Sequence, residues 1–479
     1  MKHLKNYING NWTDGDSGSF PVYNPATGEV LATVPKVSEN QVWAAVDDAE
    51  TAFLSWSRET AETRSNYLRR LYDLILEKEE DLGQTITLEQ GKPLKEGIGE
   101  VRYGASFVQW YSEETKRVNG EMIPASHQDK RIMVLKQPVG VVAAITPWNF
   151  PFAMITRKIA PALAAGCTVI IKPASQTPIS AIKIMELVEK AGFPKGVVNL
   201  VTGDAASIGK ALLDHKKVKK ITFTGSTEVG KALYREAADT VKRISLELGG
   251  QAPFIVFDDA KFPDCIQGAL ASKFRNCGQA CISSNRFYVQ KGIQKKFIEK
   301  LKSNLKNFRL GNGLTSGTDL GPLIDEKAYM KVSDHVTDAL SNGAVMEYQG
   351  EVPAKNPHGG GGYFYPPTIL SGIRQDMKIY REETFGPVIP IITFEEETEL
   401  LTMANDSDYG LAAYVYTQDL SRALKISEAL EYGIIGLNDG APSTAQAPFG
   451  GFKESGIDRE GGSYGIEPFL ETKYISIGL

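Results

Sequence analysis

Between residues 140 and 260, short apolar runs rich in Val and Ile alternate with longer segments of helical periodicity. The runs include "GVVAAIT", "CTVIIKP" and "KKITFTG", and helical patterns such as "TPISAIKIMELVEKAG" lie between such runs. Strands that alternate with helices indicate a parallel, doubly wound sheet. Ligands of such sheets bind at the carboxyl ends of the strands, so the polar residues that follow these runs are the first candidates for a site.

A second alternating region lies further along the chain. Helices are predicted over 263–278, 291–307 and 418–432, with apolar runs such as "NRFYVQ" and "VIPIITF" between them. Residues 39–117 are predicted to be helical. Two stretches, "IMVLKQPVGV" and "LETKYISIGL", alternate as exposed strands do, and the second is expected to pair elsewhere, with a subunit interface as one option. The chain is therefore an α/β protein, with a flexible loop predicted at the glycine run 358–362.

The composition excludes several classes of function. A net charge of -5 gives no sign of the excess positive charge with which proteins bind nucleic acid. Four cysteines in 479 residues do not make a disulfide framework, and the N-terminus shows no apolar signal region, so the cytoplasm is the predicted location. The longest uncharged apolar run, 159–171, is too short to span a bilayer, and no membrane partner is expected.

The segment "TFTGSTEVG" resembles a dinucleotide-binding turn with one substitution. Gly225 and Gly230 have the usual outer spacing, whereas Thr227 stands where the middle glycine lets the backbone approach a pyrophosphate. Ser226 is a candidate N-cap beside a phosphate. Taken alone, glycine and serine at such a turn are equally typical of ordinary turn chemistry.

Three polar residues stand at strand ends or in a stiff segment. Lys172 ends "TVIIK" and points toward the expected crevice, although a solvated lysine is as common there. Glu247 faces away from the apolar row of "RISLELGG" and suits a general base, although an exposed, ion-pairing glutamate is the favoured interpretation of this residue alone. Asn149, between the aromatics and prolines of "PWNFP", suits an oxyanion hole or a turn.

The segment "FRNCGQACISSNR" contains two of the four cysteines, Cys277 and Cys281, at a spacing typical of one helical turn. A metal site is not expected, because the five histidines are scattered in polar segments. A Cys–His pair stays open. We favour Cys281, which follows the predicted helix, as a nucleophile and Cys277 as a small packed residue, which is the common role of a lone cysteine.

Taken in order, "PWNFP", "KPASQTP", "FTGSTEVG", "LELGG", "GQAC", "EETFGPV" and "PFGG" resemble the aldehyde dehydrogenase superfamily over essentially the whole chain. The segments "MITRKIAPALAAG", "KFRNCGQAC" and "GGSYGIEPFLETKY" are most similar to the succinate-semialdehyde dehydrogenases. The resemblance implies two Rossmann-like, doubly wound parallel-sheet domains and a small β arm. An NAD(P)-binding domain would span 1–118 and 139–250, a catalytic domain 251–448, and an oligomerisation arm 119–138 and 465–479, joining a homodimer or homotetramer.

The resemblance also implies the role of each site residue. The nucleophile falls on Cys281, the general base on Glu247 and the oxyanion amide on Asn149, with the Cys281 N–H as a second donor. The predicted contacts to NADP or NAD fall on Trp148, Lys172, Ser175, Gly225, Ser226, Glu383 and Phe385. Because Ser175 lacks the carboxylate that would repel a 2′-phosphate, NADP is expected to be accepted.

Two arginines suggest an aldehyde with a distal carboxylate, since guanidinium binds carboxylate in a bidentate fork. The resemblance places the carboxylate on Arg157 and Arg275, with Ser443 or Thr444 assisting; structural salt bridges are the alternative for each arginine. Succinate semialdehyde is the first expectation and glutarate semialdehyde the second. A cysteine thioester hydrolase without nicotinamide, a CoA-acylating enzyme and a Cys277–Cys281 disulfide are further hypotheses.

Overall fold

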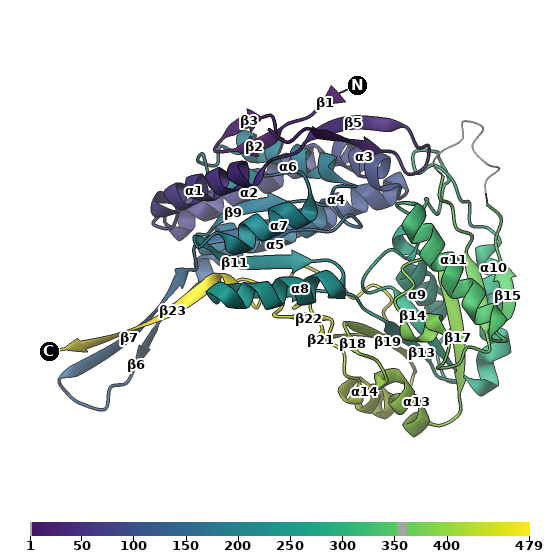
Figure 1. Cartoon of the computed structure of the whole chain (residues 1–479). Helices are drawn as coiled ribbons and strands as arrows, with labels where there is room; N and C mark the ends of the chain where they lie inside the picture. The colour runs from purple at the N-terminus through teal and green to yellow at the C-terminus, as the bar shows by residue number, and fades with distance from the viewer. Residues whose placement is uncertain (1, 353–361) are drawn as a thin grey trace.

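The computed structural model describes residues 2–352 and 362–479, so the predicted loop at 358–362 lies outside the described residues except for Gly362. One half of the molecule is built on an eight-stranded sheet, here called the first sheet (Figure 1). Its strands, in spatial order, are β22 (Gly456–Ile457), β12 (Arg243–Glu247), β11 (Val218–Thr224), β8 (Val141–Ile145), β9 (Thr168–Lys172), β10 (Val198–Leu200), β2 (Asn6–Ile8) and β3 (Asn11–Thr13). Strands β8 to β12 are parallel and the outer ones antiparallel, so the predicted doubly wound core is confirmed.

Helices cover both faces of the first sheet because each presents an apolar stripe to it. One face packs against α2 (Ala61–Glu77), α3 (Glu79–Gln90), α4 (Leu94–Glu114), α5 (Ala153–Ala165) and α6 (Pro178–Lys190). The other face packs against α1 (Glu39–Trp56), α7 (Ala205–Asp214) and α8 (Thr227–Ala237). The prediction of helices over 39–117 is thereby confirmed.

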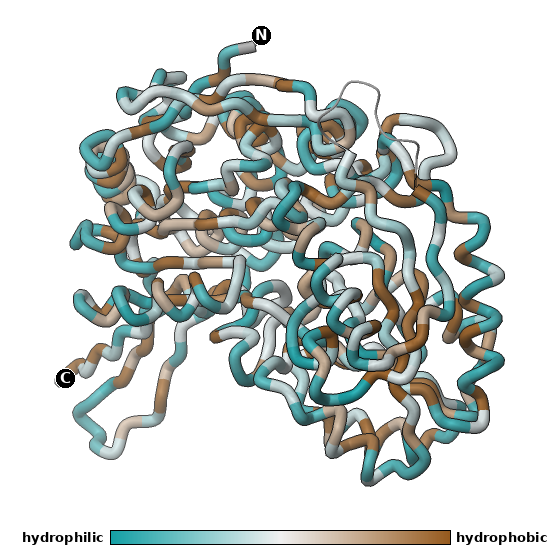
Figure 2. Tube along the Cα trace, turned by 45° about the vertical axis from the view of Figure 1, so that its right-hand side comes forward, coloured by the Kyte–Doolittle hydropathy of each residue, from teal (hydrophilic) through white to brown (hydrophobic). Residues whose placement is uncertain are grey.

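The second half is built on a seven-stranded sheet, here called the second sheet. Its strands, in spatial order, are β15 (Val345–Gln349), β16 (Thr368–Ser371), β17 (Val388–Phe394), β14 (Ser284–Gln290), β13 (Ala252–Val256), β19 (Ala412–Tyr416) and β20 (Ile434–Leu437), with β15 alone antiparallel. Its helices are α9 (Phe262–Phe274) and α10 (Gln294–Leu305) on one face, and α11 (Glu326–Ser341), α12 (Lys378–Arg381), α13 (Glu397–Asn405) and α14 (Leu420–Ala429) on the other. The hydrophobic stretches in Figure 2 run along these central strands.

A three-stranded ribbon, here called the arm, projects from the first half with the C-terminus at its tip (Figure 1). It consists of β6 (Glu121–Ile123), β7 (Lys130–Pro138) and β23 (Leu470–Gly478). The two predicted exposed strands are therefore confirmed, but β23 finds its partner within the chain, where Leu470 pairs with Pro138 and Gly478 with Lys130. The predicted domain boundaries stay a prediction.

Smaller elements complete the fold. The remaining strands are β1 (Lys2–His3), β4 (Ser19–Tyr23), β5 (Val30–Pro35), β18 (Tyr409–Gly410) and β21 (Phe452–Lys453). The 3-10 turns are η1 (Thr115–Arg117), η2 (Ala238–Thr240), η3 (Arg275–Gly278), η4 (Lys291–Ile293) and η5 (Glu467–Phe469).

The predicted helix 263–278 is wrong at its end. The α-helix α9 stops at Phe274, and Asn276, Cys277 and Gly278 all have positive φ. A Cβ on Gly278 would lie 2.3 Å from the carbonyl oxygen of Gly386, so the left-handed turn brings backbone into close approach there. Cys277 and Cys281 consequently do not share a helical turn.

Candidate active site

A cavity of about 340 Å³ opens at the carboxyl ends of β8 and β11, between the two sheets. It therefore lies where an open parallel sheet is expected to bind its ligand. Seven of the predicted residues line it: Trp148, Asn149, Gly225, Ser226, Cys281, Glu383 and Phe385. Lys331 of α11 lines it as well; a lone lysine on an amphipathic helix gave no signal in the sequence.

The Cys281 thiol is half-buried at this cavity, whereas Cys277 is buried in the apolar core beneath the second sheet. Cys281 packs against a different apolar cluster, and both thiols are free. Burial raises the pKa of Cys281 to about 12, opposed by the guanidinium groups of Arg157 and Arg275. To act as a nucleophile, the Cys281 thiol would therefore have to lose its proton.

Asn149 is held rigidly by its backbone. Its carbonyl oxygen accepts hydrogen bonds from Lys92 Nζ and Asn276 Nδ2, both at 2.8 Å. Its own Nδ2 donates to the Gln279 carbonyl at 3.1 Å. An amide NH2 has two hydrogens, so one donor remains for a ligand.

A buried ion pair explains this rigidity. Lys92 Nζ lies 2.6 Å from Glu100 Oε2, and both side chains are almost fully buried. The other oxygen, Glu100 Oε1, accepts from the N–H groups of Phe152 and Ala153 at the start of α5. The pair therefore fixes "PWNFP" to α4.

Glu247 is 3% exposed, and neither carboxylate oxygen has a hydrogen-bond partner in the described part of the chain. Burial raises the pKa of Glu247 well above its usual value, and the carboxylate of Glu460 raises it further. Arg157 and Lys158 oppose both effects. A carboxyl group with a raised pKa binds a proton more readily than a solvated one, as a general base requires.

Glu460, far from Glu247 in the sequence, lies among the same buried charged side chains. Its two oxygens lie 2.6 Å from Arg157 Nε and 2.5 Å from Lys158 Nζ. Two acidic and two basic side chains, Glu247, Glu460, Arg157 and Lys158, are thus buried together.

The glycine turn begins helix α8. Ser226 is its N-cap and accepts from the Val229 N–H at 3.4 Å, as predicted. A Cβ on Gly230 would lie 2.4 Å from Leu248, so this glycine allows α8 to pack on β12. Thr227, in place of the middle glycine, accepts from the Gly249 N–H at 3.3 Å and so ties the turn to the end of β12.

Lys172 and Ser175 lie outside the lining of this cavity. Lys172 ends β9, is 4% exposed, and burial lowers its pKa to about 8. Ser175 donates to the Gly203 carbonyl at 3.3 Å and borders a neighbouring cavity. Because Ile324 and Asp325 line both cavities, the two spaces are neighbours.

Glu383 and Phe385 reach the cavity from the segment after α12. Glu383 Oε1 accepts from the Gly250 N–H at 3.1 Å, and burial raises the pKa of this carboxyl to about 7. The Phe385 ring meets the Trp148 ring edge-on, 5.6 Å between centroids.

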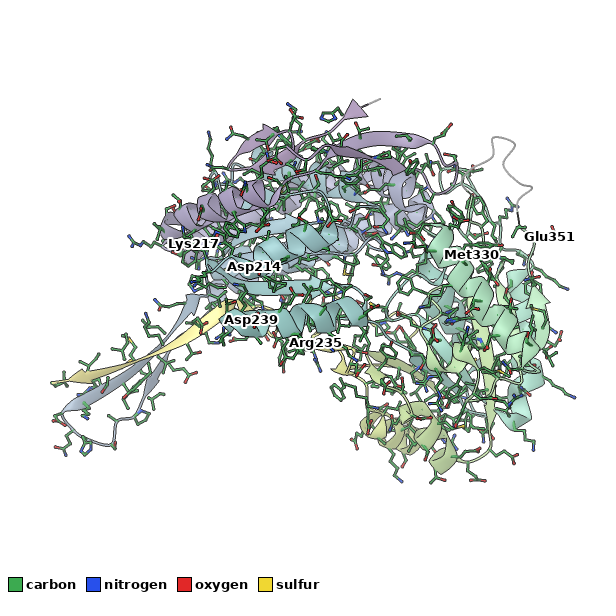
Figure 3. The ribbon with its side chains drawn as sticks, in the orientation of Figure 1. Asp214, Lys217, Arg235, Asp239, Met330 and Glu351 are labelled. Carbon is green, nitrogen blue, oxygen red and sulfur yellow. The ribbon has the colours of Figure 1, made fainter. Side chains whose placement is uncertain are left out.

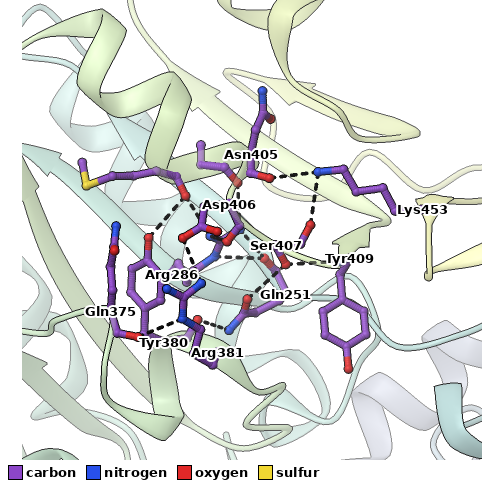
Figure 4. A network of polar contacts seen from close by, with 12 residues as sticks. Gln251, Arg286, Gln375, Tyr380, Arg381, Asn405, Asp406, Ser407, Tyr409 and Lys453 are labelled. Atoms are coloured by element: carbon purple, nitrogen blue, oxygen red, sulfur yellow. Dashed lines mark hydrogen bonds and ion pairs between the residues drawn. The ribbon is translucent and has the colours of Figure 1, made fainter.

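A buried network anchors this segment (Figure 4). The Gln251 side-chain amide donates to the Tyr380 carbonyl. Arg286 of β14 donates to the carbonyls of Gln251, Met403 and Ala404, the last two at the C-terminus of α13. A cation at a helix C-terminus is favourable. Arg286 therefore holds together β14, the C-terminus of α13 and the segment that follows Glu247.

The two candidate clamp arginines differ. Arg275 is half-buried, and among the described residues its guanidinium has no ion pair; it lies over the rings of Phe150 (4.7 Å) and Tyr103 (6.0 Å). Arg157 pairs with Glu460, yet its buried Nη2 has no acceptor in the described chain. Both charges lie close enough to Cys281 to affect its pKa.

The two candidate hydroxyls also differ. Ser443 shares a 2.6 Å hydrogen bond with the Tyr103 hydroxyl. Thr444 donates instead to Gln446 at 2.5 Å.

Residues 2–352 and 362–479 contain no group of three or more His, Cys, Asp or Glu side chains that could hold a metal ion. None of their helices is both long and apolar enough to cross a membrane.

A family model described as "Aldehyde dehydrogenase family" matches residues 12–475. A glutarate-semialdehyde dehydrogenase of Pseudomonas aeruginosa is 50% identical over 98% of this chain and 97% of its own length. A succinate-semialdehyde dehydrogenase (NADP(+)) of Escherichia coli strain K12 is 51% identical over the same shares. The crystal structure of an NADP-dependent enzyme of E. coli superposes with a TM-score of 0.97 at 50% identity, covering 100% of this chain and 98% of that one.

Proposed function

Because the chain belongs to the aldehyde dehydrogenase family, we propose that it oxidises succinate semialdehyde to succinate with NADP or NAD as hydride acceptor. The observation that carries the substrate choice is Arg275. It is a half-buried cation close enough to Cys281 to affect the pKa of that thiol, and it forms no ion pair among residues 2–352 and 362–479, although the carboxyl of Glu96 acts on it as a nearby charge. A half-buried charge without an ion-pair partner is unfavourable, and a substrate carboxylate would supply that partner.

The residues around the cavity fit a nicotinamide dinucleotide. Thr224 Oγ1, at the end of β11, is buried and has no hydrogen-bond partner in the described chain, so it can accept or donate to a polar ligand. Ser226 and the N-terminus of α8 suit a phosphate, and Glu383 suits a ribose hydroxyl. When bound, the cofactor supplies a hydride acceptor at the substrate carbon.

The chain's own residues perform the remaining steps. Cys281 Sγ loses its proton and attacks the aldehyde carbon, while Asn149 Nδ2 and the Cys281 N–H donate to the oxyanion. Once the hydride has left, the substrate is a thioester on Cys281. Glu247 removes a proton from a water molecule, which hydrolyses the thioester and releases the acid.

The distal carboxylate would bind to Arg275 and to the unsatisfied Nη2 of Arg157, with Ser443 beside them. These groups would select the substrate through its carboxylate. Glutarate semialdehyde is the alternative substrate, one methylene longer, and the P. aeruginosa relative bears that name.

The test is steady-state kinetics at 340 nm with succinate semialdehyde, glutarate semialdehyde and butanal, each with NADP and with NAD. For Arg275→Met, the ratio of kcat/KM for succinate semialdehyde over butanal is expected to fall about 100-fold, since a charge-assisted hydrogen bond is worth about 1.5–3 kcal/mol. Arg58→Met, an exposed arginine on the surface, is the control. Equal turnover of butanal and succinate semialdehyde by the wild type would contradict the substrate assignment.

We also propose that the protein assembles as a homodimer or homotetramer through the arm, where Met122, Ile123 and Tyr474 are exposed apolar side chains. The cytoplasm stays the predicted compartment, a prediction supported by four free thiols.

A further inference from the structure

We propose that Tyr103 of α4 is a third residue that binds the distal carboxylate, through its hydroxyl group. The inference rests on the proposed function and extends its substrate site to a residue that the sequence did not single out. Tyr103 lies between Arg275 and Ser443 and contacts both.

The placement of Tyr103 follows from α4. Its hydroxyl lies 2.6 Å from Ser443 Oγ, and its ring lies 6.0 Å from the Arg275 guanidinium carbon. One helical turn later, Phe107 meets the Tyr103 ring edge-on at 5.0 Å and lies 5.6 Å from the Arg157 guanidinium carbon. Neighbouring turns of one helix therefore carry the two rings that support the two arginines.

Tyr103 is connected to the reactive cavity through an apolar cluster. The Tyr103 ring packs against an apolar cluster that contains Phe150 and Met154. Met154 lines the cavity together with Cys281 and Asn149. A short aldehyde bound at Cys281 would therefore extend its far end toward Tyr103.

Hydrogen-bond counting shows what the hydroxyl pair can do. Each hydroxyl has one O–H donor, and a single bond between Tyr103 and Ser443 uses only one of them. The second O–H stays available for a ligand acceptor. A carboxylate has about four lone-pair sites, so it can accept from this hydroxyl as well as from the arginines.

This arrangement predicts selectivity. When the hydrogen-bond donors of a site have no acceptor until the substrate binds, the site discriminates strongly against an analogue without that acceptor. Butanal has the same chain length as succinate semialdehyde but no carboxylate, so only the latter gains from the Tyr103 hydroxyl.

The experiment compares Tyr103→Phe with the wild type on succinate semialdehyde and butanal at saturating NADP. The ratio of their kcat/KM values is expected to fall about tenfold, through KM for succinate semialdehyde rather than kcat. Ser443→Ala and the double variant complete a cycle, in which the two changes are expected to be non-additive. Tyr72→Phe, which removes a hydroxyl from α2, is the matched control.

Three other outcomes would contradict the inference. A Tyr103→Phe variant that loses rate equally on both aldehydes would assign Tyr103 a purely structural role and overturn the inference. An unchanged ratio would overturn it as well. A wild type without preference for succinate semialdehyde would overturn the proposed substrate first, and the inference with it.

Discussion

At the scale of single residues, the proposed general base Glu247 makes a pH dependence of the rate the first prediction. Its carboxyl group is buried with no hydrogen bond from the described chain, and the negative charge of Glu460 raises its pKa. The group must be ionised to activate water, so the acidic limb of the rate profile should report this pKa.

Glu460→Gln tests this electrostatic coupling. Removing the negative charge of Glu460 lowers the pKa of Glu247, because a like charge no longer opposes ionisation. Arg157 and Lys158 lose their partner and act on Glu247 in the same direction. The acidic limb of kcat is therefore expected to move about one unit to lower pH.

The measurement is a pH–rate profile from pH 5 to pH 9, with circular dichroism to verify folding, because breaking a buried pair costs about 3–5 kcal/mol. Glu454→Gln, which removes the partner of Lys231 at the surface, is the control. A limb that stays in place or moves to higher pH would show that Glu460 does not tune Glu247.

The sequence predicted the candidate catalytic residues better than the residues that support them. Cys281 and Asn149, which line the cavity, and Glu247, which lies outside its lining, stand in segments whose glycines, prolines or alternation are unusual, so a local signal exists. Glu460 and the Lys92–Glu100 pair gave no such signal, because an isolated charged residue in a sequence is usually a solvated one. Their meaning arises only where the fold brings distant segments together.

At the scale of elements, short-range sequence patterns predicted the strands and helices correctly, but they did not predict how the helices begin and end. A threonine before Pro178, the first residue of α6, is typical of a helix N-cap, yet the Thr177 side chain makes no capping bond. Glu89 of α3 performs that role and accepts from the N–H groups of Ile179 and Ser180. A cap from another helix cannot be inferred from neighbouring residues.

The turn after α8 offers a stability test. Val241 has φ 52° and ψ 40° and is 89% exposed, just beyond Asp239, which Figure 3 shows with Arg235 at the outer surface. A left-handed conformation costs an L-residue about 1–2 kcal/mol, and a β-branched side chain is especially unsuited to it.

Val241→Gly is therefore expected to raise the thermal midpoint by about 1–2 °C, the effect of about 1 kcal/mol in a chain of this size. The measurement is differential scanning calorimetry at one fixed scan rate. Val241→Ala keeps a Cβ and should gain less. A lower midpoint for the glycine variant would show that the valine side chain stabilises the turn by contacts outside this protomer.

At the scale of the whole molecule, the arm is the feature that extends beyond the packed body (Figure 1). Tyr474 is 61% exposed and Met122 is 66% exposed, although both are large and apolar. A ribbon with such side chains and the free edge of β6 is typical of an interface between subunits.

Tyr474→Asp is expected to shift the protein from a dimer or tetramer toward the monomer, because the charge would lose its water in the interface. Size-exclusion chromatography with light scattering at micromolar concentration measures the mass. Leu424→Asp, on the exposed side of α14, is the control for a new surface charge. A monomeric wild type, or a variant of unchanged mass, would assign the arm another role.

The long-range pairing of late segments has a consequence for biosynthesis. Strand β22 closes the edge of the first sheet, Glu460 completes the buried charge cluster, and β23 joins β7, yet all three are translated after the other strands of both sheets. At about 5–20 residues per second, β7 waits on the ribosome for tens of seconds before its partner exists. Nascent chains should therefore neither assemble nor turn over substrate until the last strand has left the exit tunnel.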